Sequence, residues 1–170
     1  VFMGMGEPLA NLNALSEAVR RLTNRQWGLA WSPRRITVST AGLASRMNEL
    51  APLGVNLAVS LNATTEEQRA RLMPAVSGIA PLKTLLAACR RYPLPPHRRL
   101  TFEYVLLAGV NDCEADAARL VKLVSGIRCK VNVIPFNPFP GSAFRRPSDH
   151  DVLAFQSIVR RAGIDVFIRK

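Results

Sequence analysis

The residues best suited to chemistry open the chain, in the segment "VFMGMGEP". Gly4 and Gly6 can let the backbone approach a ligand closely, and Glu7 is an acceptor suited to an ammonium group. The segment is not a dinucleotide fingerprint, because GxGxxG would need a glycine where Leu9 stands, and it lacks the lysine of a phosphate-binding loop. Taken alone, "GEP" is more typical of a turn with a solvated carboxylate.

Hydroxyl and amide side chains follow other apolar runs of the sequence. "STAG" offers Ser39, for which an ordinary helix N-cap is the plainer explanation. "SLN" puts Ser60 and Asn62 on one side of an extended chain and Leu61 on the other. Asn137 in "NPFPG" could bond an adenine edge or a ribose, or could close an Asx-turn.

The histidines and cysteines do not form a recognisable metal or nucleophile site. His97 and His150 lie in polar, loop-like contexts with no Cys or carboxylate at ligand spacing. Cys89, Cys113 and Cys129 are odd in number and lack CxxC spacing. This argues against a disulfide framework and against a metal site built from this chain alone, so a reducing cytoplasm is the expected compartment.

The charge of the chain favours a polyanionic partner. Its 170 residues carry 23 Lys and Arg against 12 Asp and Glu, a formal net charge of +11. Such an excess suits nucleic acid, although arginines at helix C-termini would also favour the helix dipole. No apolar run approaches the roughly 20 residues that a membrane helix needs. Arg-Arg pairs occur at Arg20-Arg21, Arg34-Arg35, Arg90-Arg91, Arg98-Arg99, Arg145-Arg146 and Arg160-Arg161.

Apolar, β-branched runs alternate with amphipathic helical patterns along the chain. Leu12, Leu15 and Val19, for example, fall on one helical face. This alternation predicts a parallel sheet with right-handed crossovers, and the near-continuous apolar runs favour strands covered on both faces. Strands are expected near residues 1–5, 35–40, 55–61, 100–107, 130–136 and 165–169.

Helix start signals agree with this alternation. Thr64 with Glu67 predicts a capping box, and Ser148 precedes the last helical pattern as an N-cap. The Pro-rich segment 92–99 is typical of a helix-to-strand loop, so one domain is expected over residues 1–170.

Polar, Gly and Pro residues gather where each predicted strand ends. In parallel α/β folds, binding sites are built at the carboxyl ends of the strands. An open sheet and a barrel both fit this pattern. A complete eight-unit barrel needs about 250 residues, so five or six units would form a partial or truncated one.

Taken together and in order, the strand-end motifs resemble a known enzyme family. The strings are "VFMGMGEPLANL", "RRITVSTAGL", "LAVSLNA", "FEYVLLAGVND" and "NVIPFNPFPGS". They resemble successive strands of the radical-SAM methyltransferases that modify carbon 2 of adenine in large-subunit ribosomal RNA and in some transfer RNAs. The similarity runs over residues 1–170, and "GMGEP" and "IPFNPFPG" are its most specific parts.

The resemblance implies how the strand ends are used. Family members hold S-adenosylmethionine (SAM) across the carboxyl edge of a partial (β/α)6 barrel, a TIM-like fold with parallel strands and outer helices. The corresponding SAM-binding residues are Gly6 and Glu7 at the methionine end, Ser39 in "STAG", Ser60, Leu61 and Asn62 in "SLN", and Asn137 in "NPFPG".

Two departures from the family pattern matter. The family usually has His where Asn62 stands, and Asn keeps a donor and an acceptor but cannot titrate. In the family, the CxxxCxxC loop of the [4Fe–4S] cluster lies upstream of "VFMGMGEP", and a methyl-carrying Cys should follow shortly after "IRK"; this sequence contains neither. The chain is therefore interpreted as the middle of such an enzyme, truncated at both ends, with SAM-binding residues but no catalytic or metal-ligating ones.

The resemblance further implies radical methylation of adenine in 23S ribosomal RNA and, in some members, transfer RNA. In such enzymes the cluster reduces SAM to a deoxyadenosyl radical. That radical takes hydrogen from a methyl group on the carrier Cys, and the carbon radical adds to the adenine ring. An RNA partner, an electron donor, a cytoplasmic location, a monomeric full-length enzyme and no membrane attachment are expected. The segment by itself is expected to be inactive.

The residues alone leave two other interpretations open. A non-catalytic RNA-binding α/β domain would share the charge and the fold class. Another barrel enzyme, such as an aldolase-like lyase, would need a Lys or a catalytic carboxylate on an inner strand. Glu103 offers such a carboxylate, and an arginine partner in the core would explain it equally well.

Overall fold

The computed structural model describes residues 1–169 and contains one five-stranded sheet. All five strands are parallel and lie in chain order, as the strand–helix alternation predicts. Lys170, which follows the last predicted strand, lies outside the described residues. The strands are β1 (Thr37–Thr40), β2 (Asn56–Ser60), β3 (Leu100–Leu106), β4 (Cys129–Pro135) and β5 (Asp165–Ile168).

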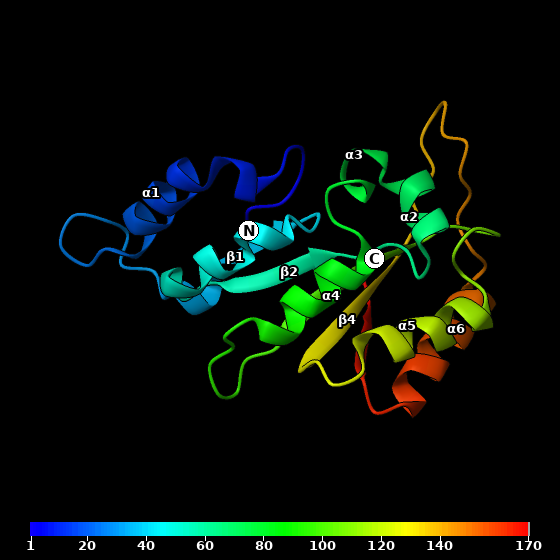
Figure 1. Cartoon of the computed structure of the whole chain (residues 1–170). Coiled ribbons are helices and arrows are strands. Elements are labelled where there is room, and N and C mark those ends of the chain that lie inside the picture. The colour runs from blue at the N-terminus through cyan, green and yellow to red at the C-terminus, as the bar shows by residue number, and fades with distance from the viewer. Residues whose placement is uncertain (170) are drawn as a thin grey trace.

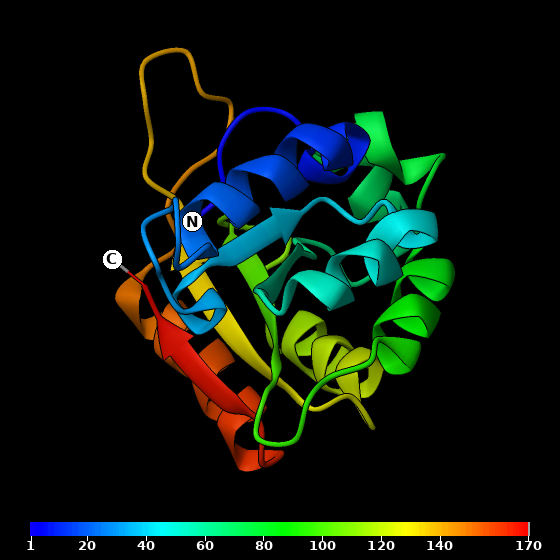
Figure 2. The same ribbon diagram turned by 90° about the vertical axis from the view of Figure 1, so that its left-hand side faces the viewer.

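Helices connect the strands and lie around the outside of the curved sheet (Figures 1 and 2). No described helix combines the length and the apolar character that crossing a bilayer requires. The α-helices are α1 (Leu12–Thr23), α2 (Glu66–Leu72), α3 (Pro74–Ser77), α4 (Leu82–Arg91), α5 (Glu114–Val124) and α6 (Asp149–Arg161). The 3-10 helices are η1 (Pro8–Asn11), η2 (Pro33–Arg35) and η3 (Ala44–Leu53).

The two faces of the sheet differ, because successive side chains of a strand point to opposite faces. On the outer face, Leu57, Phe102 and Val131 are buried in one core with Leu85 of α4 and Phe155 of α6. The sequence predicted an apolar cover on both faces of the sheet, but only the outer face has one. The alternate residues of the same strands point to the inner face, and many of them are polar. These are Ser39, Ser60, Thr101, Glu103, Lys130 and Asn132.

The run at residues 1–5, expected as a strand, makes a single bridge to the sheet. Phe2 pairs with Val38 of β1 as an isolated parallel bridge. The extended path ends there because Gly4 and Gly6 have φ angles of 125° and 90°. The segment thus becomes a loop beside the carboxyl end of β1.

One of the two helix starts expected from the sequence is shifted by a residue. Thr65 caps α2, with its hydroxyl accepting from the Gln68 amide at 3.2 Å. The expected capping box of Thr64 with Glu67 is therefore wrong. The expected cap of α6 by Ser148 is confirmed.

Burial keeps two of the three cysteines in the thiol form. Cys89 is 2% exposed within the core, and burial raises the pKa of its thiol to about 12. Cys129 begins β4, and burial raises the pKa of its thiol to about 11. Cys113 is exposed just before α5. Because the thiolate is the reactive form, Cys89 and Cys129 are poor nucleophiles at neutral pH.

We therefore expect N-ethylmaleimide to modify Cys113 in the folded protein at pH 7 while Cys89 and Cys129 stay unmodified. All three cysteines should react after unfolding in urea. Mass spectrometry of proteolytic peptides assigns the label to each cysteine. Rapid labelling of Cys89 without denaturant would contradict its burial in the core.

Candidate functional site

A hollow of about 240 Å³ opens at the carboxyl ends of β1 and β2, beside the loop that follows Phe2. We call it the β1–β2 hollow. Three residues predicted to bind SAM, Gly6, Ser39 and Ser60, line it together. Its full lining comprises Phe2, Met3, Gly4, Met5, Gly6, Pro8, Ser39, Ala41 and Ser60.

The hydroxyls of Ser39 and Ser60 are the polar side-chain groups that line this hollow. Ser39 is 8% exposed and Ser60 is half-buried. Neither hydroxyl forms a hydrogen bond with a residue in the described range 1–169. A hydroxyl can donate one hydrogen bond and accept two, so this pair can bind a polar ligand at the carboxyl edge of the sheet.

Glu7 ties the first loop to the sheet. One carboxylate oxygen accepts from the Leu9 amide at 2.9 Å and caps η1, and the other accepts from the Ala41 amide at 2.7 Å, just past β1. Glu7 is therefore not a merely solvated turn residue. It lines a neighbouring hollow of about 380 Å³ with Asn11. A carboxylate has about four lone-pair sites, so Glu7 keeps acceptor capacity for a ligand.

The other three predicted residues lie outside the β1–β2 hollow. Leu61 is fully buried in the core. Asn62 has a φ of 55°, and its side-chain oxygen accepts from the Val105 amide at 2.9 Å, which joins the end of β2 to β3. Asn137 is exposed after β4, where its Oδ1 accepts from Arg146 at 3.0 Å. These three side chains are occupied elsewhere along the carboxyl edge.

Arg69 on α2 is completely buried and holds the ends of β1 and β2 together. Its guanidinium donates to the carbonyls of Ala41 at 2.8 Å, Leu61 at 3.2 Å and Ala80 at 3.0 Å. Burial lowers the pKa of Arg69, against a smaller opposing effect of Glu66. The cation forms no ion pair within residues 1–169, so three carbonyl oxygens and the Met73 sulfur, which accepts from Nη1 at 3.7 Å, replace its hydration.

The peptide groups of Ala41 are thus fixed on both sides, by Glu7 at the amide and by Arg69 at the carbonyl. The adjacent Gly42 leaves room for this contact: its φ is 114°, and an added Cβ would lie 3.0 Å from both Arg69 Nη2 and Leu85. Arg69 could not be predicted from the sequence, because helical periodicity does not separate a buried arginine from an exposed one. The small residues Ala41 and Gly42 of "STAG" were the one sequence feature that could have indicated a close contact there.

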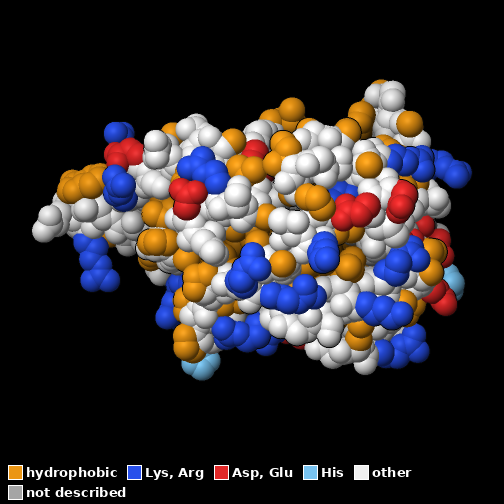
Figure 3. Space-filling model, viewed as in Figure 1, with side chains coloured by type: hydrophobic (Ala, Val, Ile, Leu, Met, Phe, Trp, Pro, Cys, Tyr) orange, Lys and Arg blue, Asp and Glu red, His pale blue; other side chains and the backbone are white. Residues whose placement is uncertain are grey.

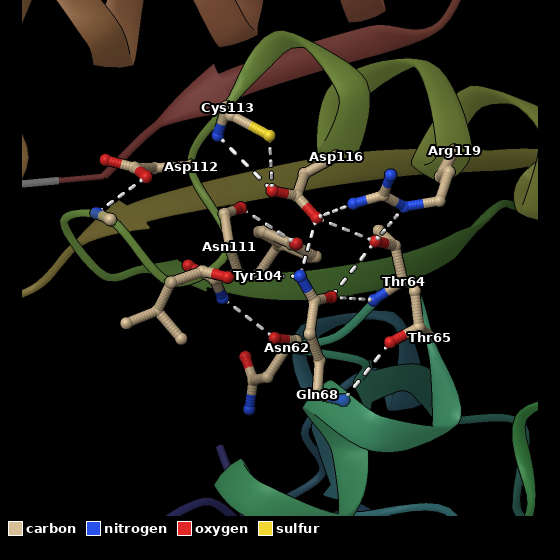
Figure 4. A network of polar contacts seen from close by, with 12 residues as sticks. Asn62, Thr64, Thr65, Gln68, Tyr104, Asn111, Asp112, Cys113, Asp116 and Arg119 are labelled. Carbon is tan, nitrogen blue, oxygen red and sulfur yellow. Dashed lines mark hydrogen bonds and ion pairs between the residues drawn. The ribbon is translucent and has the colours of Figure 1, made fainter.

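A second network joins the loops that follow β2 and β3 (Figure 4). Asn111 is fully buried, and its amide donates to the carbonyls of Asn62 and Val105, both at 2.8 Å. Its side-chain oxygen accepts from the Leu107 amide at 2.8 Å, and the Tyr104 hydroxyl donates to its carbonyl at 3.0 Å. These bonds satisfy backbone groups that a strand end would otherwise leave unpaired.

Asp116, in the first turn of α5, is the central acceptor of this network (Figure 4). Thr64, Gln68 and Arg119 donate to its Oδ1, and the Cys113 thiol donates to its Oδ2. Burial alone would raise the pKa of Asp116, but these hydrogen bonds outweigh it and hold the pKa below its ordinary value. Folding therefore favours the charged carboxylate.

Glu103 on the inner face of β3 lacks the arginine partner considered from the sequence. It is 5% exposed, and its Oε1 accepts from Asn132 Nδ2 at 2.9 Å. Its Oε2 has no hydrogen-bond partner among the described residues. The strand register sets Glu103 beside Ser60 of β2, so this carboxylate extends the polar inner face next to the β1–β2 hollow.

Relatives match the whole of this chain. It is 55% identical over 171 residues to the dual-specificity RNA methyltransferase RlmN of Syntrophobacter fumaroxidans, and 53% identical over 171 residues to the RlmN of Syntrophotalea carbinolica, with 100% of the chain covered in each case. The chain belongs to the RlmN family. The resemblance drawn from "GMGEP" and "IPFNPFPG" is confirmed. No protein-family model matches the chain.

This RlmN-family chain spans about half the length of the relatives it matches, 49% and 45% of the two named above. A crystal structure of a radical SAM methyltransferase from Sphaerobacter thermophilus superposes with a TM-score of 0.91 at 46% identity, covering 98% of this chain and 49% of that one. A domain of pyruvate-formate lyase-activating enzyme from Bacteroides vulgatus superposes with a TM-score of 0.74 at 19% identity, covering 99% and 97%. The second likeness shows the fold alone. The predicted α/β fold class is confirmed.

Replacing Arg69 tests whether the carboxyl edge depends on it. Arg69→Met removes the guanidinium from three carbonyls and leaves those of Ala41 and Ala80 without a donor, while Leu61 keeps the Ala63 amide, so we expect the free energy of unfolding to fall by about 2–5 kcal/mol. Arg71→Met, at an exposed position of the same helix, is the matched control and should change it by less than about 0.5 kcal/mol. Urea unfolding measures both, and equal effects would contradict the role of Arg69.

Asp116 should make stability depend on pH in the acid range. Because its folded-state pKa lies below the unfolded value of about 3.9, its contribution is present above that value and is lost as the pH falls through the folded-state pKa. We expect Asp116→Asn to lower stability at pH 7 by about 1.5–3 kcal/mol and to weaken the acid dependence. Urea unfolding across a pH series measures this, with Asp149→Asn as the exposed control. An acid dependence unchanged in Asp116→Asn would exclude the role of Asp116.

Proposed function

We propose that this chain forms the SAM-binding part of a radical-SAM methyltransferase that methylates carbon 2 of adenine in 23S ribosomal RNA and in transfer RNA. The identity to a dual-specificity RNA methyltransferase and the close likeness to a radical SAM methyltransferase support the proposal. One structural observation carries it: Ser39 and Ser60 present unbonded hydroxyls to one hollow at the carboxyl edge of a parallel sheet. Family membership favours this function over the two rival interpretations.

The donors and acceptors around the β1–β2 hollow fit a ligand that is both polar and apolar, as SAM is. Ser39 and Ser60 would bind its polar groups, and the backbone at Gly6 would border it on the loop side. Glu7 would accept from the ammonium group while its bonds to the main chain hold it in place. When bound, SAM supplies the methyl group and the carbon–sulfur bond from which radical chemistry starts.

The remaining predicted contacts would lie along the same edge of the sheet. Leu61 could contribute only its backbone, because its side chain is in the core. Asn62 follows β2 and Asn137 follows β4. Their side chains would have to exchange present partners, Val105 and Arg146, or bind through remaining donors. The part of these residues is to orient the ligand and exclude water.

The described residues do not fit the [4Fe–4S] cluster that the family implies. Cluster ligands are cysteine thiolates, and burial keeps Cys89 and Cys129 in the thiol form. Within residues 1–169, no three His, Cys, Asp or Glu side chains form a metal-binding group. Neither the cluster nor the electron transfer to it is assigned to a residue of this chain.

The charge of the chain supports an RNA partner. Its net charge is +11, and Figure 3 shows Lys and Arg side chains spread over the lower half of one face. RNA phosphates neutralise such a surface and release counterions, so binding should weaken as salt rises. The proposed full-length enzyme is cytoplasmic, acts as a monomer and receives electrons from a separate donor.

Calorimetric titration of the full-length protein with SAM tests the proposed site. Ser39→Ala and Ser60→Ala each remove one hydroxyl and should weaken SAM binding by about three- to tenfold. Glu7→Gln keeps the shape and removes the charge, so a loss of about ten- to hundredfold is expected. Wild-type affinity in all three variants would exclude the β1–β2 hollow as the SAM site.

The controls separate loss of binding from loss of folding. Ser45→Ala changes an exposed serine of η3 and should leave SAM affinity unchanged. Urea unfolding of the Glu7→Gln variant shows whether the loop contacts at Leu9 and Ala41 are also weakened. A variant that unfolds like the wild type but binds SAM weakly supports a direct contact.

A further inference from the structure

The loop between α1 and η2 exposes both tryptophans of the chain. Trp27 is 59% exposed, Leu29 is 60% exposed and Trp31 is 49% exposed. Figure 1 shows this segment projecting past the end of α1, away from the sheet. We call residues 24–32 the tryptophan loop. Large apolar side chains gathered on one exposed segment indicate a contact surface.

Hydrogen bonds within the tryptophan loop fix its backbone. The side-chain oxygen of Asn24 accepts from the amides of Gln26 at 2.8 Å and Trp27 at 3.0 Å. The Trp31 amide donates to the Leu22 carbonyl of α1 at 2.8 Å. The main chain that carries both exposed indoles is therefore fixed within the loop and to α1.

Close backbone packing also keeps this loop against the end of α1. The Leu29 amide donates to the Arg21 carbonyl at 3.1 Å. A Cβ added to Gly28 would lie 2.2 Å from the same carbonyl oxygen, so glycine is required there. Ala30 has a φ of 53°, which costs free energy in a residue other than glycine. Such a conformation persists only where the surrounding structure enforces it.

Arginines lie on both sides of the exposed tryptophans. Glu17 pairs with Arg20 at 3.2 Å and Arg21 at 3.0 Å. Figure 3 shows the apolar tip flanked by basic side chains at the left end of the molecule. The arginines of this region that form no ion pair within residues 1–169 are Arg25, Arg34 and Arg35.

We propose that the tryptophan loop binds RNA by stacking Trp27 and Trp31 on unpaired bases while the neighbouring arginines contact phosphates. Every base offers a face for stacking, and phosphates supply the anions that these arginines lack. An apolar protein segment would cover the indoles but leave the arginines unpaired. The inference rests on the proposed RNA substrate. It adds a contact at the amino end of β1, whereas the β1–β2 hollow lies at the carboxyl end.

The binding of a fluorescein-labelled RNA hairpin with an unpaired loop, measured by anisotropy on the full-length protein, tests this contact. Trp27→Ala and Trp31→Ala should each weaken binding by about five- to hundredfold, and the Phe variants should keep most of the affinity. A fully paired duplex should bind all variants alike, because its bases are not available. Leu153→Ala, an equally exposed apolar residue on α6, is the matched control and should change nothing.

Salt dependence separates stacking from charge. The tryptophan variants should keep the wild-type slope of log affinity against log salt, since stacking releases no counterions. Arg25→Gln should reduce the slope by about 1. Wild-type hairpin affinity in the double Trp27→Ala, Trp31→Ala variant overturns the inference. SAM titration of that variant should match the wild type, because the loop lies far from the β1–β2 hollow. If the wild type itself does not bind SAM, that result counts against the proposed function and not against the RNA contact of this loop.

Acrylamide quenching of tryptophan fluorescence shows whether the loop is free. Trp27 and Trp31 are the only tryptophans of this chain, and the difference between the full-length wild type and its double Trp27→Ala, Trp31→Ala variant gives the signal of the loop. Both tryptophans should be quenched in the free protein and protected by the hairpin. Tryptophans already shielded before RNA is added would mean that another protein segment or a second copy covers the loop, which overturns the inference.

Discussion

One buried cation organises the carboxyl edge of the sheet. Arg69 has no exposed surface, and its guanidinium donates to carbonyls just past β1, just past β2 and just before α4. A planar fork with five donors can serve several carbonyls from one position, whereas an ammonium group is a compact point charge. The chain leaves each strand there, so its carbonyls no longer have a sheet partner. Ser39 and Ser60 lie one or two residues before the peptides that Arg69 holds, so the β1–β2 hollow depends on it.

The carboxyl edge continues as a chain of side-chain contacts from one strand end to the next. Glu7 and Arg69 hold the peptide groups past β1, and Arg69 also reaches the end of β2. Asn62 then bonds the main chain of β3, and Asn111 bonds back to the loop after β2. Asp116 receives donors from both loops. Each contact satisfies a buried polar group, so removing one partner costs more than the bond itself contributes.

The two ends of the sheet suit different tasks. The carboxyl end offers a small hollow with unbonded hydroxyls and a tethered carboxylate, which suits a single small ligand. The amino end of β1 offers an ordered loop with exposed indoles among arginines, which suits a large polyanion. In the proposed function, one RNA molecule is long enough to contact both ends, so its reacting base and its supporting contacts need not share one pocket.

The sequence by itself determined the fold class, the family and the edge at which the candidate site was predicted. Strand–helix alternation requires parallel strands, and parallel strands bring their carboxyl ends to one edge, so Ser39 and Ser60 could be paired in advance. Tertiary structure alone decided that Leu61 packs in the core, that Asn62 bonds β3 and that Arg69 is buried. Local patterns encode helix, strand and side-chain parity. The carbonyl that a long side chain contacts depends on how distant segments pack. Arg69, for example, donates to the carbonyl of Ala41, 28 residues earlier in the chain.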